Sequence, residues 1–146
     1  MGSGPKACRE EAETKDSSVS SQGVTFDTGM LVALERRKRT AWQIYRRVHE
    51  RHALITVPAA VLGEWWRGRT DLRDAIRRSV RIEPLTEVIA CLAGEALAAV
   101  RRATTIDAFV MASAALRGDV VYSDDLEDLE RLRTFFPGVR VYSIGR

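Results

Sequence analysis

The 146-residue sequence contains little cysteine, histidine or lysine, and each shortage excludes some classes of protein. Its two cysteines, Cys8 and Cys91, form neither a metal-binding spacing nor a disulfide framework, which fits a reducing compartment. The two histidines, His49 and His52, have no cysteine partners, so we expect no zinc site. They also lie in a charged stretch, which leaves no serine–histidine or cysteine–histidine pair as a candidate nucleophile.

Long hydrophobic runs are also missing. No window approaches the roughly 18 consecutive apolar residues that a membrane span needs, and the first residues lack the apolar stretch of a secretory signal. Residues 1–22 are polar and show no apolar period, so we expect a disordered arm or an upstream or expression-related extension there. The remainder, 23–146, is predicted to form one cytoplasmic domain, because 45% hydrophobic and 29% charged residues are typical of globular proteins.

The positive charge is carried almost entirely by arginine, since lysine occurs only at positions 6, 15 and 38. Arginine suits phosphate recognition because its planar fork makes bidentate contacts. A codon preference of the genome explains the same bias equally well, and the formal net charge is only +3. Composition alone therefore does not establish nucleic-acid binding.

Beyond residue 22, short β-branched runs alternate with segments of helical period. The pattern predicts strands at 23–27, 53–57, 81–85, 119–123 and 139–144, with helices at 30–37, 40–52, 59–68, 71–80, 87–101, 106–117 and 125–135. Thr40, Thr86 and Thr105 are predicted N-caps, Pro58 suits a first helical turn, and Gly68 is predicted to end its helix. Strands separated by helices favour a three-layer α/β/α sandwich around a central, mostly parallel sheet.

Acidic residues follow two of these strands and lie on two of the helices. Asp27 ends the first strand, Asp124 and Asp125 follow the fourth, and Glu64 and Asp107 lie on helices. Ligands collect at the carboxyl ends of parallel strands, so we expect these acids to converge there. Clustered carboxylates repel one another unless a hard cation such as Mg²⁺ or Mn²⁺ neutralises them. The residues therefore favour metal-assisted phosphodiester hydrolysis.

Each acid also has a purely structural interpretation. Asp27 fits a turn at the end of a strand, and Asp124 and Asp125 both begin sequences that resemble capping boxes. Asp107 is favoured at a helix N-terminus by the macrodipole, and Glu64 fits an exposed helix charge. Only their joint occurrence favours a site.

The Asp-Thr-Gly of residues 27–29 also occurs in aspartic proteases, where it presents one half of a carboxyl dyad. Those small proteases are mostly β, whereas this chain is predicted to be rich in helix. Pro58 and the following Glu-Trp-Trp place the apolar-apolar-Gly segment on a helix, and a second Asp-Thr-Gly would have to come from another subunit. We therefore consider the protease interpretation remote.

Four stretches together resemble the PIN-domain ribonucleases, specifically the VapC-like toxins of bacterial type II toxin–antitoxin pairs. They are "TFDTGMLVALE", "VPAAVLGEWWRG", "TTIDAFVMASAALRGD" and "VVYSDDLEDLERL", followed by a closing "VRVYSI", and the resemblance covers residues 24 to about 144. The family's acidic site matches Asp27, Glu64, Asp107 and Asp125. The family pattern Thr-Ser-Asp-x-x-Asp-Leu aligns with residues 123–129, so Asp124 replaces a serine and Asp128 matches the later aspartate.

The resemblance implies a Mg²⁺- or Mn²⁺-dependent endoribonuclease that cuts tRNA or rRNA and stops translation. Its metal ligands would be Asp27, Asp107 and Asp125, with Glu64, Asp124 and Asp128 as secondary candidates. It also implies a VapB-like antitoxin as partner, and a homodimer or a toxin–antitoxin hetero-oligomer. A non-catalytic PIN module that binds RNA or protein is the alternative.

Two arginine-rich stretches, at 35–51 and 67–81, are candidates for steering RNA toward the acids. Trp65 or Trp66 is a candidate for base stacking. A solvated face with an antitoxin-docking groove explains the same stretches equally well, and core or interface packing explains the tryptophans better.

Overall fold

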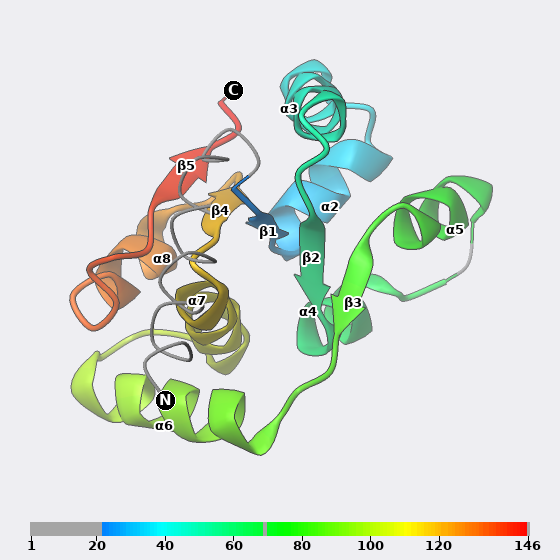
Figure 1. The fold of residues 1–146 in the computed structure, drawn as a ribbon. Coiled ribbons are helices and arrows are strands. Elements are labelled where there is room, and N and C mark those ends of the chain that lie inside the picture. The colour runs from blue at the N-terminus through cyan, green and yellow to red at the C-terminus, as the bar shows by residue number, and fades with distance from the viewer. Residues whose placement is uncertain (1–21, 69, 146) are drawn as a thin grey trace, which may run out of the picture.

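Five short strands form one parallel sheet in the order β3-β2-β1-β4-β5, which places β1 at its centre (Figure 1). The protein was analysed as a computed structural model that describes residues 22–68 and 70–145. The strands are β1 (Val24–Phe26), β2 (Ile55–Pro58), β3 (Arg81–Glu83), β4 (Val120–Ser123) and β5 (Val141–Ser143). The predicted arm at 1–22 lies outside the described residues except for Gln22.

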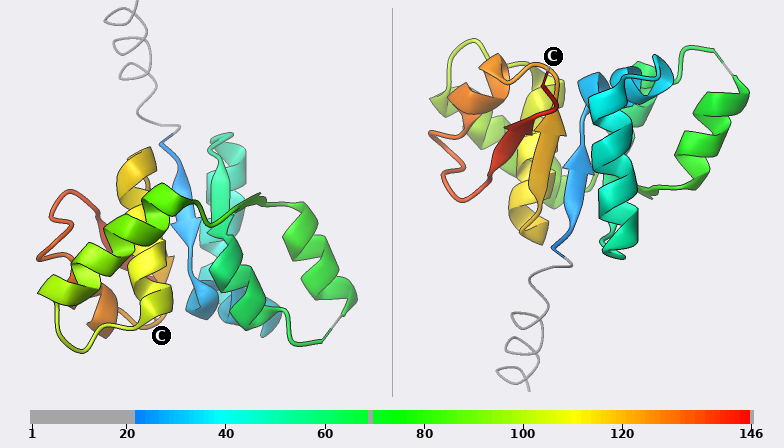
Figure 2. Two further views of the ribbon diagram at one scale, coloured as in Figure 1. Left: turned by 90° about the horizontal axis from the view of Figure 1, so that it is seen from below. Right: turned by 90° about the horizontal axis from the view of Figure 1, so that it is seen from above.

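Helices cover both faces of the sheet. They are α2 (Thr28–Glu35), α3 (Arg39–Glu50), α4 (Ala59–Trp65), α5 (Asp71–Arg78), α6 (Glu87–Ala99), α7 (Thr105–Arg117) and α8 (Glu127–Leu132). Figure 2 shows α6 and α7 in front of the sheet in one view and α3 in front of it in the opposite view. The predicted α/β/α sandwich is therefore confirmed. None of the described helices is both long and apolar enough to cross a membrane.

The strand order explains where a ligand can approach. From β1 the chain moves outward to β2 and β3, then crosses back over the sheet and adds β4 on the other side of β1. The connections on the two sides of β1 therefore run over opposite faces, which makes the carboxyl ends of β1 and β4 the place where such sheets generally bind ligands. Val24 and Phe26 of β1 are fully buried in the core, so this edge is anchored at the centre of the molecule.

Three residues that were predicted to cap or end helices do not do so. Helix α3 begins at Arg39 after the N-cap Lys38, so Thr40 lies inside the helix instead of capping it. Thr104 caps α7 in place of Thr105, since its hydroxyl accepts a hydrogen bond from the Asp107 amide at 3.2 Å. Helix α4 ends at Trp65, before Gly68. The prediction that Thr86 caps α6 is confirmed, with its hydroxyl 3.2 Å from the Ile89 amide.

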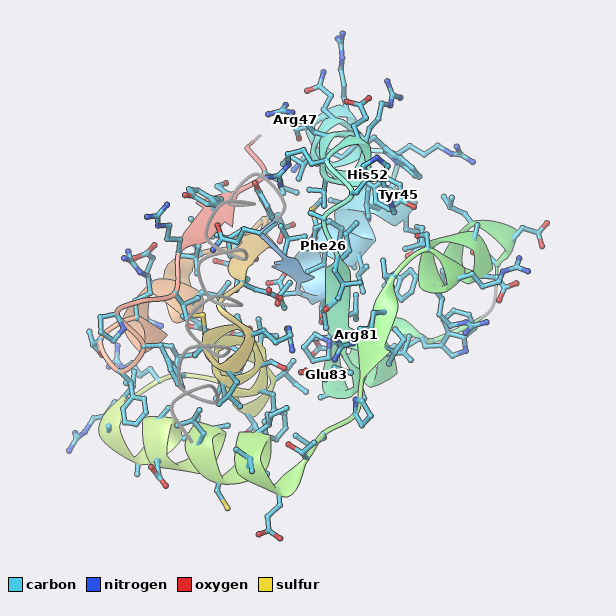
Figure 3. All side chains as sticks on the ribbon, in the orientation of Figure 1. Phe26, Tyr45, Arg47, His52, Arg81 and Glu83 are labelled. Carbon is cyan, nitrogen blue, oxygen red and sulfur yellow. The ribbon has the colours of Figure 1, made fainter. Side chains whose placement is uncertain are left out.

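A buried polar network links the end of α7 to the sheet, and it was not anticipated from the sequence. Arg117 donates hydrogen bonds to Thr25 Oγ1 at 2.7 Å and to Asp119 Oδ2 at 2.9 Å, and it forms an ion pair with Glu83. Figure 3 labels Glu83 at the end of β3. Thr25 also donates to Asp119 at 2.9 Å, and Ser113 donates to Glu83. Burial alone would raise the pKa of Glu83, but the Arg117 and Ser113 hydrogen bonds hold this pKa below its ordinary value.

Candidate active site

Asp27 lies at the carboxyl end of β1 and is only 7% exposed. Its Oδ1 atom accepts a hydrogen bond from the Met30 amide at 3.0 Å, so the same carboxyl that ends the strand caps α2. Burial raises the pKa of Asp27 to about 7, and the nearby Asp107 and Asp124 carboxylates raise it further. Hydrogen bonds from Ser123 and Met30 act in the opposite direction. Asp27 is therefore a buried carboxyl with acidic neighbours.

Asp107 lies in the first turn of α7, which runs back along the sheet from the edge that carries Asp27. Burial raises the pKa of Asp107, and the nearby Asp128 and Glu64 carboxylates raise it further, while the hydrogen bond with Thr104 lowers it. Helix α7 is rich in small residues, so it packs closely beneath β1, β2 and β4. This close packing brings Asp107 next to the end of β1.

Glu64 approaches the site from α4, which contacts both α2 and α7. The Thr28 hydroxyl donates a hydrogen bond of 2.5 Å to Glu64 Oε1. Thr28 begins α2 directly after Asp27, so this bond ties Glu64 to the turn that presents Asp27. Glu64 is therefore not simply a solvated helix charge, although its side chain is exposed.

Asp124 and Asp125 follow β4, and their carboxyls take different directions. A Cβ atom at Gly29 would lie 2.1 Å from Asp124 Oδ1, so the Asp124 carboxyl rests directly against the Asp27-Thr28-Gly29 turn. Asp124 is also among the charges that act most strongly on Asp27. The Asp125 carboxyl instead accepts a hydrogen bond from the Glu127 amide at 3.2 Å, at the start of α8. The structure thus places Asp124 next to Asp27 and gives Asp125 a capping contact.

Asp128 joins the cluster from the first turn of α8. Its carboxyl interacts with that of Asp107 both through charge and through a hydrogen bond. Its Oδ1 atom also accepts a hydrogen bond of 2.6 Å from Arg131. Asp128 therefore connects the acidic cluster to the nearest arginine of α8.

The donor set fits a hard divalent cation. The five carboxyls that the fold brings together belong to Asp27, Glu64, Asp107, Asp124 and Asp128, and neither lysine nor arginine is among the groups that act most strongly on Asp27 or Asp107. Within 22–68 and 70–145, no three ligand side chains aim at one point closely enough to hold an ion as they stand. Glu64 and Asp124 are exposed, so their carboxylates are accessible from solvent. Oxygen ligands of this kind suit Mg²⁺ or Mn²⁺.

Four polar or small residues of the site were missed in the sequence. Thr28 and Thr104 hold Glu64 and the start of α7, Ser123 hydrogen-bonds with Asp27, and Gly29 leaves room for Asp124. In the sequence, the three hydroxyl residues could have been identified only as serines and threonines that lie near acids at the ends of strands or the starts of helices. Such a signal is weak, because serine and threonine are equally common in ordinary turns and caps.

The structure corrects the role considered for one tryptophan. Trp65 is only 4% exposed, and its ring nitrogen donates to Glu35 at 3.3 Å, so its ring is not available for a base. Trp66 is half-buried, and the Arg77 guanidinium lies 5.8 Å from its ring centroid. Core packing therefore explains Trp65.

The parallel sheet with helices on both faces and acids at the ends of β1 and β4 defines a PIN-like α/β domain, and comparison with solved structures agrees. A chain of VapBC2 from Rickettsia felis, bound to a DNA fragment from their promoter, matches with a TM-score of 0.66 at 11% identity over 82% of this chain and 97% of that chain. A chain of a toxin–antitoxin complex from Klebsiella pneumoniae matches with a TM-score of 0.65 at 18% identity over 84% and 98%.

A chain of DNA-bound VapBC from Salmonella typhimurium gives a TM-score of 0.64 at 17% identity, over 84% of this chain and 98% of that chain. No family model and no curated protein sequence matches. At these identities the likeness shows a shared fold. The resemblance in the four sequence stretches is therefore confirmed at the level of the PIN-like fold.

Proposed function

We propose that this protein is a metal-dependent endoribonuclease of the VapC type, a toxin that cuts tRNA or rRNA in the cytoplasm and inhibits translation. The observation that carries this proposal is a row of neighbouring carboxyls at the carboxyl edge of a PIN-like sheet: Asp107 and Asp124 act on the buried Asp27, and Glu64 and Asp128 act on Asp107. Structural matches to chains of VapBC complexes support the toxin assignment. They also support a VapB-like antitoxin as the partner.

In this proposal Asp27, Asp107 and Asp124 hold Mg²⁺ or Mn²⁺, with Asp128 and Asp125 as further candidates. When bound, such an ion lowers the pKa of a water and neutralises charge on the phosphate that is cut. Glu64 orients the attacking water and accepts its proton, because the Thr28 hydrogen bond holds its carboxylate beside the site. Ser123 and the Met30 amide stabilise the ionised form of Asp27.

The cluster of carboxyls repels RNA phosphates, so other residues must hold the substrate. Exposed arginines lie near the same edge in the α2–α3 connection, at Arg36 and Arg37, and in the α6–α7 connection, at Arg101 and Arg102. These cations attract the RNA backbone without specifying its sequence. The cation-rich connections thus compensate for the negative charge of the site.

The test is cleavage of total tRNA and rRNA by the purified protein with Mg²⁺ or Mn²⁺. Asp27→Asn and Asp107→Asn are expected to lower the cleavage rate by at least about 100-fold, since each removes a ligand. Glu95→Gln on the exposed side of α6 serves as the control with the same chemical change. Cleavage at the wild-type rate by either aspartate variant would contradict the site.

Within the described residues, no three ligand side chains aim at one point, and this observation favours a second function without metal-dependent catalysis. A non-catalytic PIN module would bind RNA or protein without cutting it. Retention of full-length RNA by the wild-type chain, with both Mg²⁺ and Mn²⁺ present, would establish that function instead.

A further inference from the structure

A groove of about 340 Å³ lies between α3 and the strands β4 and β5, and none of the site acids lines it. Two tyrosines form its floor, because Tyr122 and Tyr142 lie opposite each other in the parallel register of β4 and β5. Thr40, Gln43 and Arg47 of α3 form its opposite wall. Figure 3 labels Arg47 on α3, on the side near the carboxyl end of the chain. The groove is thus aromatic on one side and polar on the other.

The tyrosine floor has the geometry of a stacking platform. The two ring centroids are 5.6 Å apart with an angle of 36° between the ring planes. Tyr122 also packs edge-on against the buried Phe26, with centroids 6.3 Å apart, which holds this ring in place. Tyr142 is 42% exposed, so part of its ring surface is accessible from outside. A flat π-system can therefore stack on a platform that is already ordered.

The α3 wall offers hydrogen-bonding groups to a ligand. The Thr40 hydroxyl oxygen is buried and has no hydrogen-bond partner among the described residues, which is unusual for a buried polar atom. The exposed Gln43 amide provides both a donor and acceptors beside it, and the exposed Arg47 adds a positive charge. A ligand with an aromatic ring, polar ring atoms and a negative group matches these features.

The groove and the acidic site are connected through β4. The Asp27 amide donates to the Tyr122 carbonyl at 3.5 Å, and the chain continues from Tyr122 through Ser123 to Asp124. The tyrosine floor and the acids are therefore separated by about two residues along one strand. A single polynucleotide can occupy both places.

We propose that this groove binds one unpaired nucleotide of the RNA substrate. Its base stacks on Tyr142 and contacts Thr40 and Gln43 through its edge, and its phosphate pairs with Arg47. This inference rests on the proposed ribonuclease function and names a subsite outside the metal-binding acids. Because stacking accepts any base, the groove selects unpaired RNA more strongly than it selects a sequence.

Charge favours RNA over a second copy of the chain as the occupant. Residues 36–51 contain seven arginines and lysines and one glutamate, and all but one of the seven are exposed. In a two-fold interface the same surface of both copies meets, so two arginine-rich α3 helices would face each other. Polyanionic RNA is attracted by the same helix.

The test measures binding of a fluorescein-labelled RNA of about ten uridines or adenosines by anisotropy, with EDTA present to prevent cleavage. Tyr142→Ala is expected to weaken binding about tenfold or more, whereas Tyr142→Phe keeps the ring and binds within about twofold of the wild type. Arg47→Gln is expected to weaken RNA binding and to reduce the dependence of binding on salt concentration. Arg46 is exposed on the same helix but lies outside the groove, so Arg46→Gln is expected to have a smaller effect. With cleavable RNA, Tyr142→Ala should raise KM more than it lowers kcat.

Each alternative result is informative. Equal binding by Tyr142→Ala and the wild type overturns the proposal, as does a wild type that binds neither RNA. A Tyr142→Ala variant that instead converts a dimer to monomers in sedimentation makes a second copy the occupant and also overturns it. If Asp27→Asn abolishes cleavage while Tyr142→Ala binds RNA normally, the proposed nucleotide subsite is wrong but the nuclease function stands. If Tyr142→Ala weakens RNA binding but the wild type never cuts RNA, the nuclease function is wrong but the subsite stands.

Discussion

At the scale of single residues, the most consequential contact is that between Gly29 and Asp124. Any side chain at Gly29 would meet the Asp124 carboxyl, with a Cβ atom only 3.0 Å from its Cγ and 2.1 Å from its Oδ1. The glycine of the Asp-Thr-Gly turn therefore serves a packing purpose, since it makes room for an acid that follows another strand. The family pattern has serine at the position of Asp124, so the carboxylate there departs from that pattern.

We therefore expect Asp124→Asn to weaken Mg²⁺ or Mn²⁺ binding by about tenfold or more, because affinity depends on the number of charged ligands. The matched change is Asp125→Asn, whose carboxyl accepts from the Glu127 amide and which should retain most of the affinity. Isothermal titration calorimetry compares the two variants without relying on activity. The opposite ranking would assign the ligand to Asp125, as the family alignment does.

At the scale of elements, α7 connects the acidic site to the buried polar network. Its first turn carries Asp107, and its last turn carries Arg117, which is bonded to β1 and β3. Arg117, Glu83 and Asp119 have side chains that are 15%, 13% and 7% exposed, so these ion pairs are largely shielded from water. The network therefore sets the position of α7 along the sheet.

Arg117→Met is expected to lower the free energy of unfolding by roughly 3–5 kcal/mol, because it leaves Glu83 and Asp119 buried without their cation. Arg78→Met provides the control, since Arg78 is 66% exposed and pairs with Asp74 at 2.9 Å, and such surface pairs contribute under about 1 kcal/mol. Urea denaturation at pH 7 measures both. Equal losses in the two variants would show that the network adds no more than a surface pair.

At the scale of the whole molecule, the strand order makes the carboxyl edge near β1 both the centre of the fold and the position of its least compensated charge. In the folded chain the Asp27 carboxyl has a pKa of about 7, so it still binds a proton at pH 5 or 6. In the unfolded chain its pKa is the ordinary 3.8, so it has already lost that proton at the same pH. The free energy of unfolding of the metal-free protein therefore decreases as pH rises from about 4 to about 7 through this group. The decrease can reach about 4 kcal/mol, at 1.36 kcal/mol per pKa unit.

Asp27→Asn should remove this decrease while keeping the α2 cap, because asparagine is an equally good N-cap. We expect the variant to be more stable than the wild type at pH 8 in EDTA, and the difference to shrink toward pH 5. Urea denaturation at the two pH values provides the comparison. A wild type that is as stable as the variant at pH 8 would mean that Asp27 ionises as an ordinary carboxyl.

Much of the fold was predictable because it depends on local patterns. Within residues 22–68 and 70–145, short β-branched runs and helical periods identified every strand and helix. The alternation of the two favoured a parallel sheet with helices on both faces. The errors concerned the residues at which helices begin, such as Thr40 and Thr105. A residue one or two positions earlier is the N-cap in each case, and hydrophobic period does not distinguish between such close neighbours. The acids at the ends of β1 and β4 were likewise identifiable, because their positions follow from where those strands end.

Only the tertiary structure decided which groups meet. The direction of the Asp124 and Asp125 carboxyls depends on a turn against Gly29 and on the start of α8, and the Arg117 network joins residues up to 94 positions apart. Neither contact leaves a period or a spacing in the chain. The sequence by itself determined the elements and their order, since these follow from local hydrophobicity and backbone preference, whereas contacts between distant side chains exist only once the sheet has assembled.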